Sequence, residues 1–151
     1  MIELDIIETN ELPAEWLEGL KAYASVADDS QDAILAPLLL RAIYRVQEKA
    51  DKTILPCKLR LEETEVENGI VRLYQTIKSI DRVTDGEGNE IRWTRANRTL
   101  SCGNVDSVVV EYTTQANEGN VNELMPVVYQ YAAALYDGQD SQIEYILRQC
   151  R

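Results

Sequence analysis

The sequence predicts an α+β fold that is mostly helical. We expect a small four-helix bundle, with two N-terminal and two C-terminal helices, and an antiparallel β insertion between the two pairs. Apolar residues recur at three- and four-residue spacing near both ends of the chain, and they alternate with polar residues in between. The 151 residues suffice for one domain with a sizeable core. The predicted organisation is a single domain over 1–151, with a helical pair at 12–52, the β insertion at 54–114 and the C-terminal helices at 123–151.

The N-terminal segment is short and acidic. Its apolar residues Ile2, Leu4 and Ile6 alternate with polar ones, which indicates a strand or an extended arm. Pro13 suits the first turn of a helix, because the missing N–H would have no partner there anyway. Apolar residues at helical spacing follow, so we expect a helix at about 13–25.

The strongest helical pattern lies at about 31–51. Asp28, Asp29 and Ser30 precede it and are residue types that cap helix N-termini, while Asp32 falls in the electropositive first turn. One continuous apolar stripe indicates that this helix packs on a core. The stripe comprises Leu35, Leu38, Leu39, Ala42, Ile43 and Val46.

The β insertion is predicted from alternation and turn chemistry. Residues 57–65 alternate, Asn68-Gly69 is a strong hairpin signal, and 70–76 would form the return strand. A second glycine-rich turn is expected at 85–90. The region should hold five or six short strands in an antiparallel sheet.

The C-terminal helices are expected at about 123–136 and 141–150. Gly138 fits the residue that ends the first of them. Ser141 and Glu144 have the spacing of a capping box for the second.

Composition excludes several function classes. The chain carries 26 Asp and Glu against 15 Lys and Arg, a formal net charge of −11, whereas a non-specific nucleic-acid binder needs a basic face. The absence of His excludes His-based nucleophile pairs and His–metal sites. Cys57, Cys102 and Cys150 are odd in number and far apart, so we expect buried free thiols rather than disulfides or a zinc site. No apolar run approaches membrane-spanning length, so neither a transmembrane helix nor a signal peptide is expected.

Acidic clusters offer weak candidates for chemistry. Residues 62–67 are rich in Glu, but alternation would place these charges on the solvated face of a hairpin. Residues 28–32 resemble a calcium loop but lack its Gly and terminal Glu, which favours helix capping. We therefore expect no catalytic residue, no metal and no cofactor.

One basic segment surrounds a tryptophan. Arg92, Arg95 and Arg98 flank Trp93 and could stack a nucleic-acid base. The overall negative charge favours a structural strand with exposed arginines instead.

Tyrosines gather near the C-terminus. Of eight Tyr, four lie between 129 and 145, and such rings suit either a wet protein interface or a core whose hydroxyls reach solvent. The short last helix must pack on something, either on the helix at 123–136 or on a partner. The candidate interface residues are Tyr129, Tyr136, Ile143, Tyr145, Ile146, Leu147 and Arg148.

Several segments resemble the head–tail connector (adaptor) family of long-tailed bacteriophages and prophages. The resemblance is carried by LKAYASVADDSQDAILAPLLLRAIYRVQEKADKTI at 20–54, IKSIDRVTDGEGNEIRW at 77–93, VVVEYTT at 108–114 and ELMPVVYQYAAALYD at 123–137. These are packing patterns rather than catalytic signatures.

The resemblance implies a non-enzymatic structural protein of virion assembly and DNA packaging. Copies would form a ring under the portal, extend the DNA channel and dock the tail-completion (stopper) protein. The location would be the head–tail junction of the virion, after assembly in the host cytoplasm. DNA would pass through without specific binding, which the acidic composition favours, and no membrane would be involved. The alternatives are a soluble acidic protein-binding module and a small carboxylate-dependent enzyme.

Overall fold

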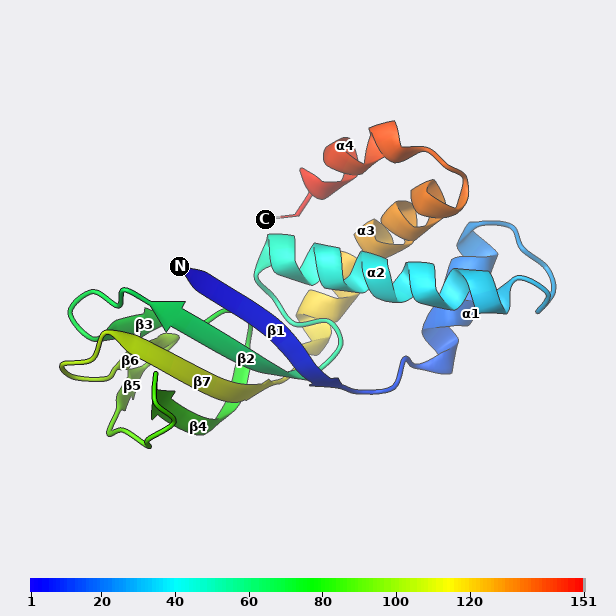
Figure 1. The fold of residues 1–151 in the computed structure, drawn as a ribbon. Coiled ribbons are helices and arrows are strands. Elements are labelled where there is room, and N and C mark those ends of the chain that lie inside the picture. Colours follow the sequence, from blue (N-terminus) through cyan, green and yellow to red (C-terminus); the bar gives the residue numbers. More distant parts are fainter. Residues whose placement is uncertain (151) are drawn as a thin grey trace. The chain divides into compact units, whose positions relative to one another are not determined.

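A computed structural model describes residues 1–150 of the chain, which divide into two compact units (Figure 1). The β unit comprises Met1–Asn10 and Pro56–Gln115. The helical unit comprises Glu11–Leu55 and the chain from Ala116 onward. Each unit has its own core of buried apolar side chains.

The β unit consists of two antiparallel sheets. The larger sheet has the strand order β1-β2-β7-β4 and the smaller one β3-β6-β5. Side chains from both sheets share one core, in which Leu61 and Val110 of the larger sheet accompany Val71 and Leu100 of the smaller one. The strands are β1 (Ile2–Thr9), β2 (Cys57–Thr64), β3 (Ile70–Arg72), β4 (Ile77–Asp85), β5 (Thr94–Ala96), β6 (Thr99–Ser101) and β7 (Ser107–Thr114).

The helical unit is formed by α1, α2 and α3 with a short C-terminal segment. In α2, Gln47 is buried and its Oε1 accepts hydrogen bonds from the backbone N–H of Ile54 and Leu55, at 3.1 and 3.3 Å. This holds the chain that leaves the helix against the core. The elements are α1 (Ala14–Tyr23), α2 (Asp32–Ala50), α3 (Glu118–Tyr136), the 3₁₀ turn η1 (Asp140–Gln142) and α4 (Ile143–Leu147).

The prediction of a mostly helical four-helix bundle is wrong. The fold is α+β, with 37% of the residues helical and 29% in strands. The region predicted as an insertion builds a core of its own and recruits the N-terminal strand β1 onto β2. The fourth helix contributes only five residues, too few to form one side of a bundle.

The hairpin predicted at Asn68-Gly69 is wrong in its pairing. Both residues do have positive φ, 56° and 69°, but β3 pairs with β6 and not with β2. Glu65 also has a positive φ of 60°, so the chain turns away at the end of β2 before it reaches Asn68. A Cβ on Gly69 would lie 1.8 Å from the carbonyl oxygen of Gly103, so this close approach requires glycine.

The N-termini of three helices differ from expectation in their capping or in their position. α2 begins as predicted, but its N-cap is Gln31 and no side chain caps it. α3 begins at Glu118 rather than 123, because the side chain of Asn117 accepts a hydrogen bond from the N–H of Asn120. The predicted capping box does not form, since Ser141 lies inside η1 and the N-cap of α4 is Gln142, with no side-chain hydrogen bond.

Other expectations are confirmed. Ile2, Leu4 and Ile6 belong to a strand, and Gly138, with φ of +69°, follows the end of α3. The three cysteines are buried and free, and burial raises the pKa of all three thiols. Among residues 1–150, no helix is both long and apolar enough to cross a membrane.

Candidate functional site

Two predicted interface tyrosines pack inside the helical unit. The rings of Tyr129 and Tyr23 stack with centroids 6.3 Å apart and an interplanar angle of 28°. Burial, followed by the charge of Glu15, raises the pKa of Tyr129. Tyr136 is half-buried and its hydroxyl donates to Gln31 Oε1 at 3.3 Å. Both rings therefore support the packing of α3 on the helices before it.

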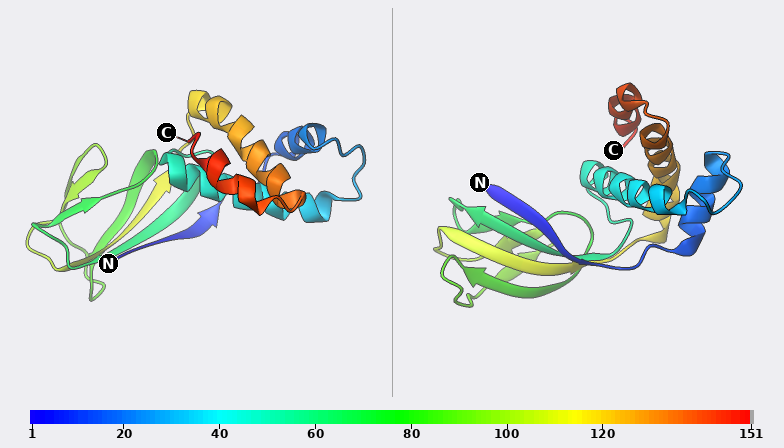
Figure 2. Two further views of the ribbon diagram at one scale, coloured as in Figure 1. Left: turned by 90° about the horizontal axis from the view of Figure 1, so that it is seen from above. Right: turned by 45° about the vertical axis from the view of Figure 1, so that its right-hand side comes forward.

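The short helix α4 folds back on α3 (Figure 2). Ile146 and Leu147 are buried in the helical core, and Ile143 packs against it. Gln149 Nε2 donates to Gln130 Oε1 at 3.2 Å, which also ties the C-terminal segment to α3. Of the two arrangements considered for this helix, packing on its own chain is the one the structure contains.

The outward face of α4 is different. Tyr145 is 66% exposed, the highest value among the large apolar residues of the helical unit. Arg148, the residue after α4, is exposed as well. Of the seven predicted interface residues, these two are the ones accessible to a partner without rearrangement of the core.

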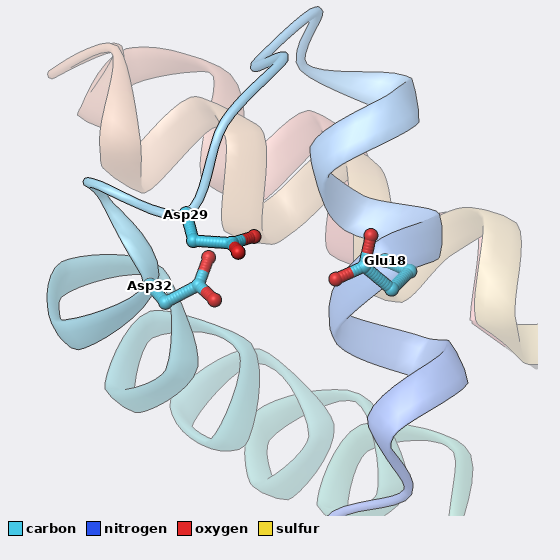
Figure 3. Close-up of side chains that lie close together, drawn as sticks. All are labelled: Glu18, Asp29 and Asp32. Atoms are coloured by element: carbon cyan, nitrogen blue, oxygen red, sulfur yellow. The ribbon is translucent and has the colours of Figure 1, made fainter.

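A charged cluster joins α1 to the start of α2 (Figure 3). Glu18, Asp29 and Asp32 each place one carboxylate oxygen within 4.8 Å of the others. The ammonium of Lys21, whose side chain is 4% exposed, lies between them. It is 3.3 Å from Glu18 and 3.1 Å from Asp32, and it also bonds Asp29.

The charge of Lys21 determines whether this cluster could bind a metal ion. The hydrogen bond that Lys21 donates to Asp29, then those to Asp32 and Glu18, raise the pKa of Lys21 above its ordinary value, so its charge is fixed. The ammonium takes the position that a bound cation would need. The three carboxylates are therefore partners of an internal cation, and the cluster is a structural link rather than a metal centre.

The cluster replaces the helix capping that was predicted for residues 28–32. Asp28 accepts hydrogen bonds from the N–H and Oγ of Ser30, at 3.0 and 2.5 Å, and these bonds lower its pKa. Asp29 and Asp32 bond Lys21 instead of backbone N–H groups. One signal could have revealed this, because Lys21 is the sole Lys or Arg within the first 40 residues.

The basic segment around Trp93 lies at an exposed edge of the β unit. Arg92, Trp93 and Arg95 are all exposed, and β5 begins only at Thr94, so the strand is shorter than the pattern indicated. The Nε of Arg95 donates to the carbonyl oxygen of Asn97 at 2.7 Å. Beside it lies a shallow hollow of about 470 Å³, lined by Ile91, Arg92, Trp93, Thr94 and Ser101.

Comparison with known proteins identifies the fold. Neither a protein-family model nor a curated protein matches the chain. A chain in the neck of an empty gene transfer agent (GTA) particle, computed with C6 symmetry, superposes with a TM-score of 0.66 at 15% identity, over 89% of this chain and 84% of that chain. A chain of the virion of a native GTA particle gives 0.66 at 14%, over 98% and 94%. A chain in the neck of a native GTA particle, computed with C12 symmetry, gives 0.60 at 16%, over 95% and 94%. The chain shares the fold of these three GTA chains, two of which come from necks computed with C6 or C12 symmetry.

Proposed function

We propose that the chain is a structural head–tail connector (adaptor) of a bacteriophage, a prophage or a related particle. Copies form a ring under the portal, extend the DNA channel and dock the tail-completion proteins. The observation that carries this proposal is the shared fold, which extends over 94% of two GTA chains and nearly the whole of this one. The likeness spans both units, which supports the proposal that they act together as one connector-like domain.

The chemistry of the chain supports a structural rather than an enzymatic role. In the acidic cluster with the right spacing for a metal, the ammonium of Lys21 already bonds all three carboxylates. The net charge of −11 suits a channel through which DNA slides, because a negative wall avoids the phosphate contacts that would hold the DNA.

The exposed side of α4 is the surface we assign to a protein partner. Tyr145 offers a large ring with a polar tip, a residue type enriched at interfaces. Arg148 lies at the C-terminal end of the helix, where a cation is favourable and can meet an acidic group of the portal or of the stopper protein. Ile146 and Leu147 hold this surface in place from the core side.

Particle assembly tests the proposal. In the cell that encodes the chain, deletion of its gene should leave DNA-filled heads and separate tails, both visible by electron microscopy. Restoring the gene should restore joined particles. Normal tailed particles without the gene would overturn the proposed function. Electron microscopy of the purified chain provides a second measurement, with a ring on the order of a dozen copies expected.

A further inference from the structure

Strand β1 is an uncovered edge of the larger sheet. All eight of its residues are exposed, although it pairs with β2 from Ile2 to Ile6 and again, after an irregularity at Ile7, at Glu8 and Thr9. Ile2, Leu4 and Ile6 are 46%, 38% and 40% exposed. Leu4 and Ile6 lie opposite the buried residues Leu61 and Leu59, on the core-facing side of the sheet. The buried core of the β unit thus extends to β2 but not to β1, so the apolar row of Ile2, Leu4 and Ile6 is exposed.

The same strand is strongly acidic. Glu3, Asp5 and Glu8 alternate with the apolar row, and no ion pair engages them within residues 1–150. No Lys or Arg occurs before Lys21. Two copies of β1 placed side by side would bring these carboxylates together, which disfavours a symmetric β1–β1 contact.

A complementary edge exists on the smaller sheet. Strand β5 is the outer strand of the order β3-β6-β5, and all three of its residues are exposed. Arg92 and Arg95 are exposed and engage no carboxylate within the described residues, and no acid occurs between 91 and 101. Trp93 is 39% exposed beside the shallow hollow. This edge thus combines positive charge with uncovered apolar surface.

The other edge of the larger sheet is less suited to strand addition. Strand β4 is irregular at two places, Ile77/Ser79 and Ile80/Arg82. Its far end is already covered, because Glu90 forms a bridge to Thr84 and the N–H of Ile91 bonds the carbonyl oxygen of Val83 at 3.3 Å. Bulges and covered ends are features that block pairing with another chain.

We propose that β1 of one copy pairs with the edge formed by Arg92–Ala96 of the next copy. This inference rests on the proposed ring and names the contact that builds it. Side chains alternate between the two faces of a strand, so Trp93 and Arg95 share one face and Arg92 lies on the other. The apolar row of β1 then lies beside Trp93, and the carboxylates of Glu3 and Asp5 lie on the same face as the guanidinium group of Arg92, while Arg95 adds positive charge to this edge. The two edges differ, so the contact is head-to-tail, the kind that closes into a cyclic assembly.

Charge reversal tests this contact. The variant Glu3→Lys/Asp5→Lys makes both edges positive, and Arg92→Glu/Arg95→Glu makes both negative. Each variant alone should need at least ~tenfold more protein than the wild type to assemble, because like charges then meet. A mixture of the two variants should assemble, since each positive edge meets a negative one. Light scattering after size-exclusion chromatography measures the mass in each case.

A matched control separates specific from general charge effects. The variant Glu87→Lys/Glu123→Lys changes the net charge as much as Glu3→Lys/Asp5→Lys does, at exposed positions on the turn after β4 and on α3, and it should assemble like the wild type. All altered residues are exposed, so circular dichroism should show unchanged folding. If the wild type assembles and both charge-reversed variants assemble equally well, the inferred contact is wrong, but the proposed function stands. A wild-type chain that stays monomeric at every concentration would overturn the inference and remove the ring from the proposed function.

Discussion

The helical unit and the β unit treat their charged and apolar side chains differently. In the helical unit, the one early lysine is surrounded by three carboxylates, and the C-terminal helix is folded onto the core. In the β unit, an eight-residue strand leaves both its carboxylates and its apolar row exposed. Side chains that are paired internally hold a fold together, whereas a surface whose charges and apolar groups both lack partners is suited to binding. Within this one acidic chain, the charges of the helical unit therefore stabilise the fold, and those of β1 are available to bind a partner.

The largest expected effect comes from deleting the C-terminal segment from residue 139 onward. Ile146, Leu147 and Cys150 are buried in the helical core, and each such side chain contributes about 1.5–3 kcal/mol. Their sum is comparable with the whole stability of a domain, so the helical unit should unfold. Hydrogen exchange should then show unprotected amides in α1–α3 and protected ones in β2 and β7.

The exposed face of α4 supplies the control for this deletion. Tyr145→Ala should change the free energy of unfolding by less than about 0.5 kcal/mol, because the ring is 66% exposed. It should weaken binding to a partner if this face is the docking surface. A truncated chain that stays folded but fails to join particles would show instead that α4 acts in docking and not in the core.

Two glycines, one in each unit, have the same backbone conformation but different surroundings. Gly69 in the β unit and Gly138 in the helical unit have the same positive φ, 69°. A Cβ at Gly138 meets nothing within 4 Å, whereas one at Gly69 would lie 1.8 Å from a backbone oxygen. Gly138→Ala should therefore cost only the strain of the backbone conformation, about 1 kcal/mol, and Gly69→Ala clearly more. Equal costs in urea unfolding would show that the close approach at Gly69 relaxes.

The sequence predicted individual elements better than their partners. The apolar stripe of α2 and the alternation in β2 and β7 depend on local periodicity, and all three elements occur where expected. Strand pairing depends on contacts distant in sequence, so β1 on β2 and β3 on β6 were not foreseen. The balance between bundle and sheet was wrong for the same reason, because the amphipathic stripes do not reveal that the β region has its own core.

At the candidate site, too, local features were predicted better than contacts between distant residues. Exposure of Tyr145 and burial of Ile146 and Leu147 follow from one helix packing on another, and the sequence left both arrangements of α4 open. The link from Lys21 to Asp29 and Asp32 was missed, because the aspartates also fit the pattern of a helix cap. The prediction that the seven residues 129, 136, 143 and 145–148 form an interface with a partner stays a prediction.

Breaking the Lys21 cluster should destabilise the helical unit more than the β unit. Lys21→Met leaves three carboxylates within 4.8 Å of one another without their cation, so the melting temperature should fall, and more so at low salt. Arg41→Met is a matched control, since Arg41 is exposed on α2 and no salt bridge engages it in the described part of the chain. A melting temperature that is equally low for both variants would contradict the special role of Lys21.

The pH dependence of the same cluster has a defined sign. The folded pKa of Lys21 lies above its ordinary value of 10.5, so the stabilisation is complete below that value and is lost as pH rises through the folded pKa. Urea unfolding from pH 9 upward should show the wild type losing more stability than Lys21→Met. Parallel curves would contradict the coupling.

The smallest expected effect is on the acid side, at the turn of the β unit. Asp85 accepts hydrogen bonds from the N–H groups of Asn89 and Glu87, at 3.0 and 2.9 Å, and these bonds lower its pKa below the ordinary value of 3.8. A group with a lowered folded pKa stabilises the fold above its unfolded pKa, and that contribution is lost as pH falls through the folded one.

Asp85→Asn retains an acceptor oxygen but has no charge to titrate, so its stability should fall less than that of the wild type below about pH 4. Because Asp85 ends β4 beside an exposed turn, salt and water screen the effect, and the difference should be a small one in urea midpoints measured between pH 2 and pH 6. As a control, hydrogen exchange at neutral pH should show protected amides in β4 of both proteins, which means that the turn still forms. Identical losses of stability in acid would show that the charge on Asp85 does not stabilise the fold.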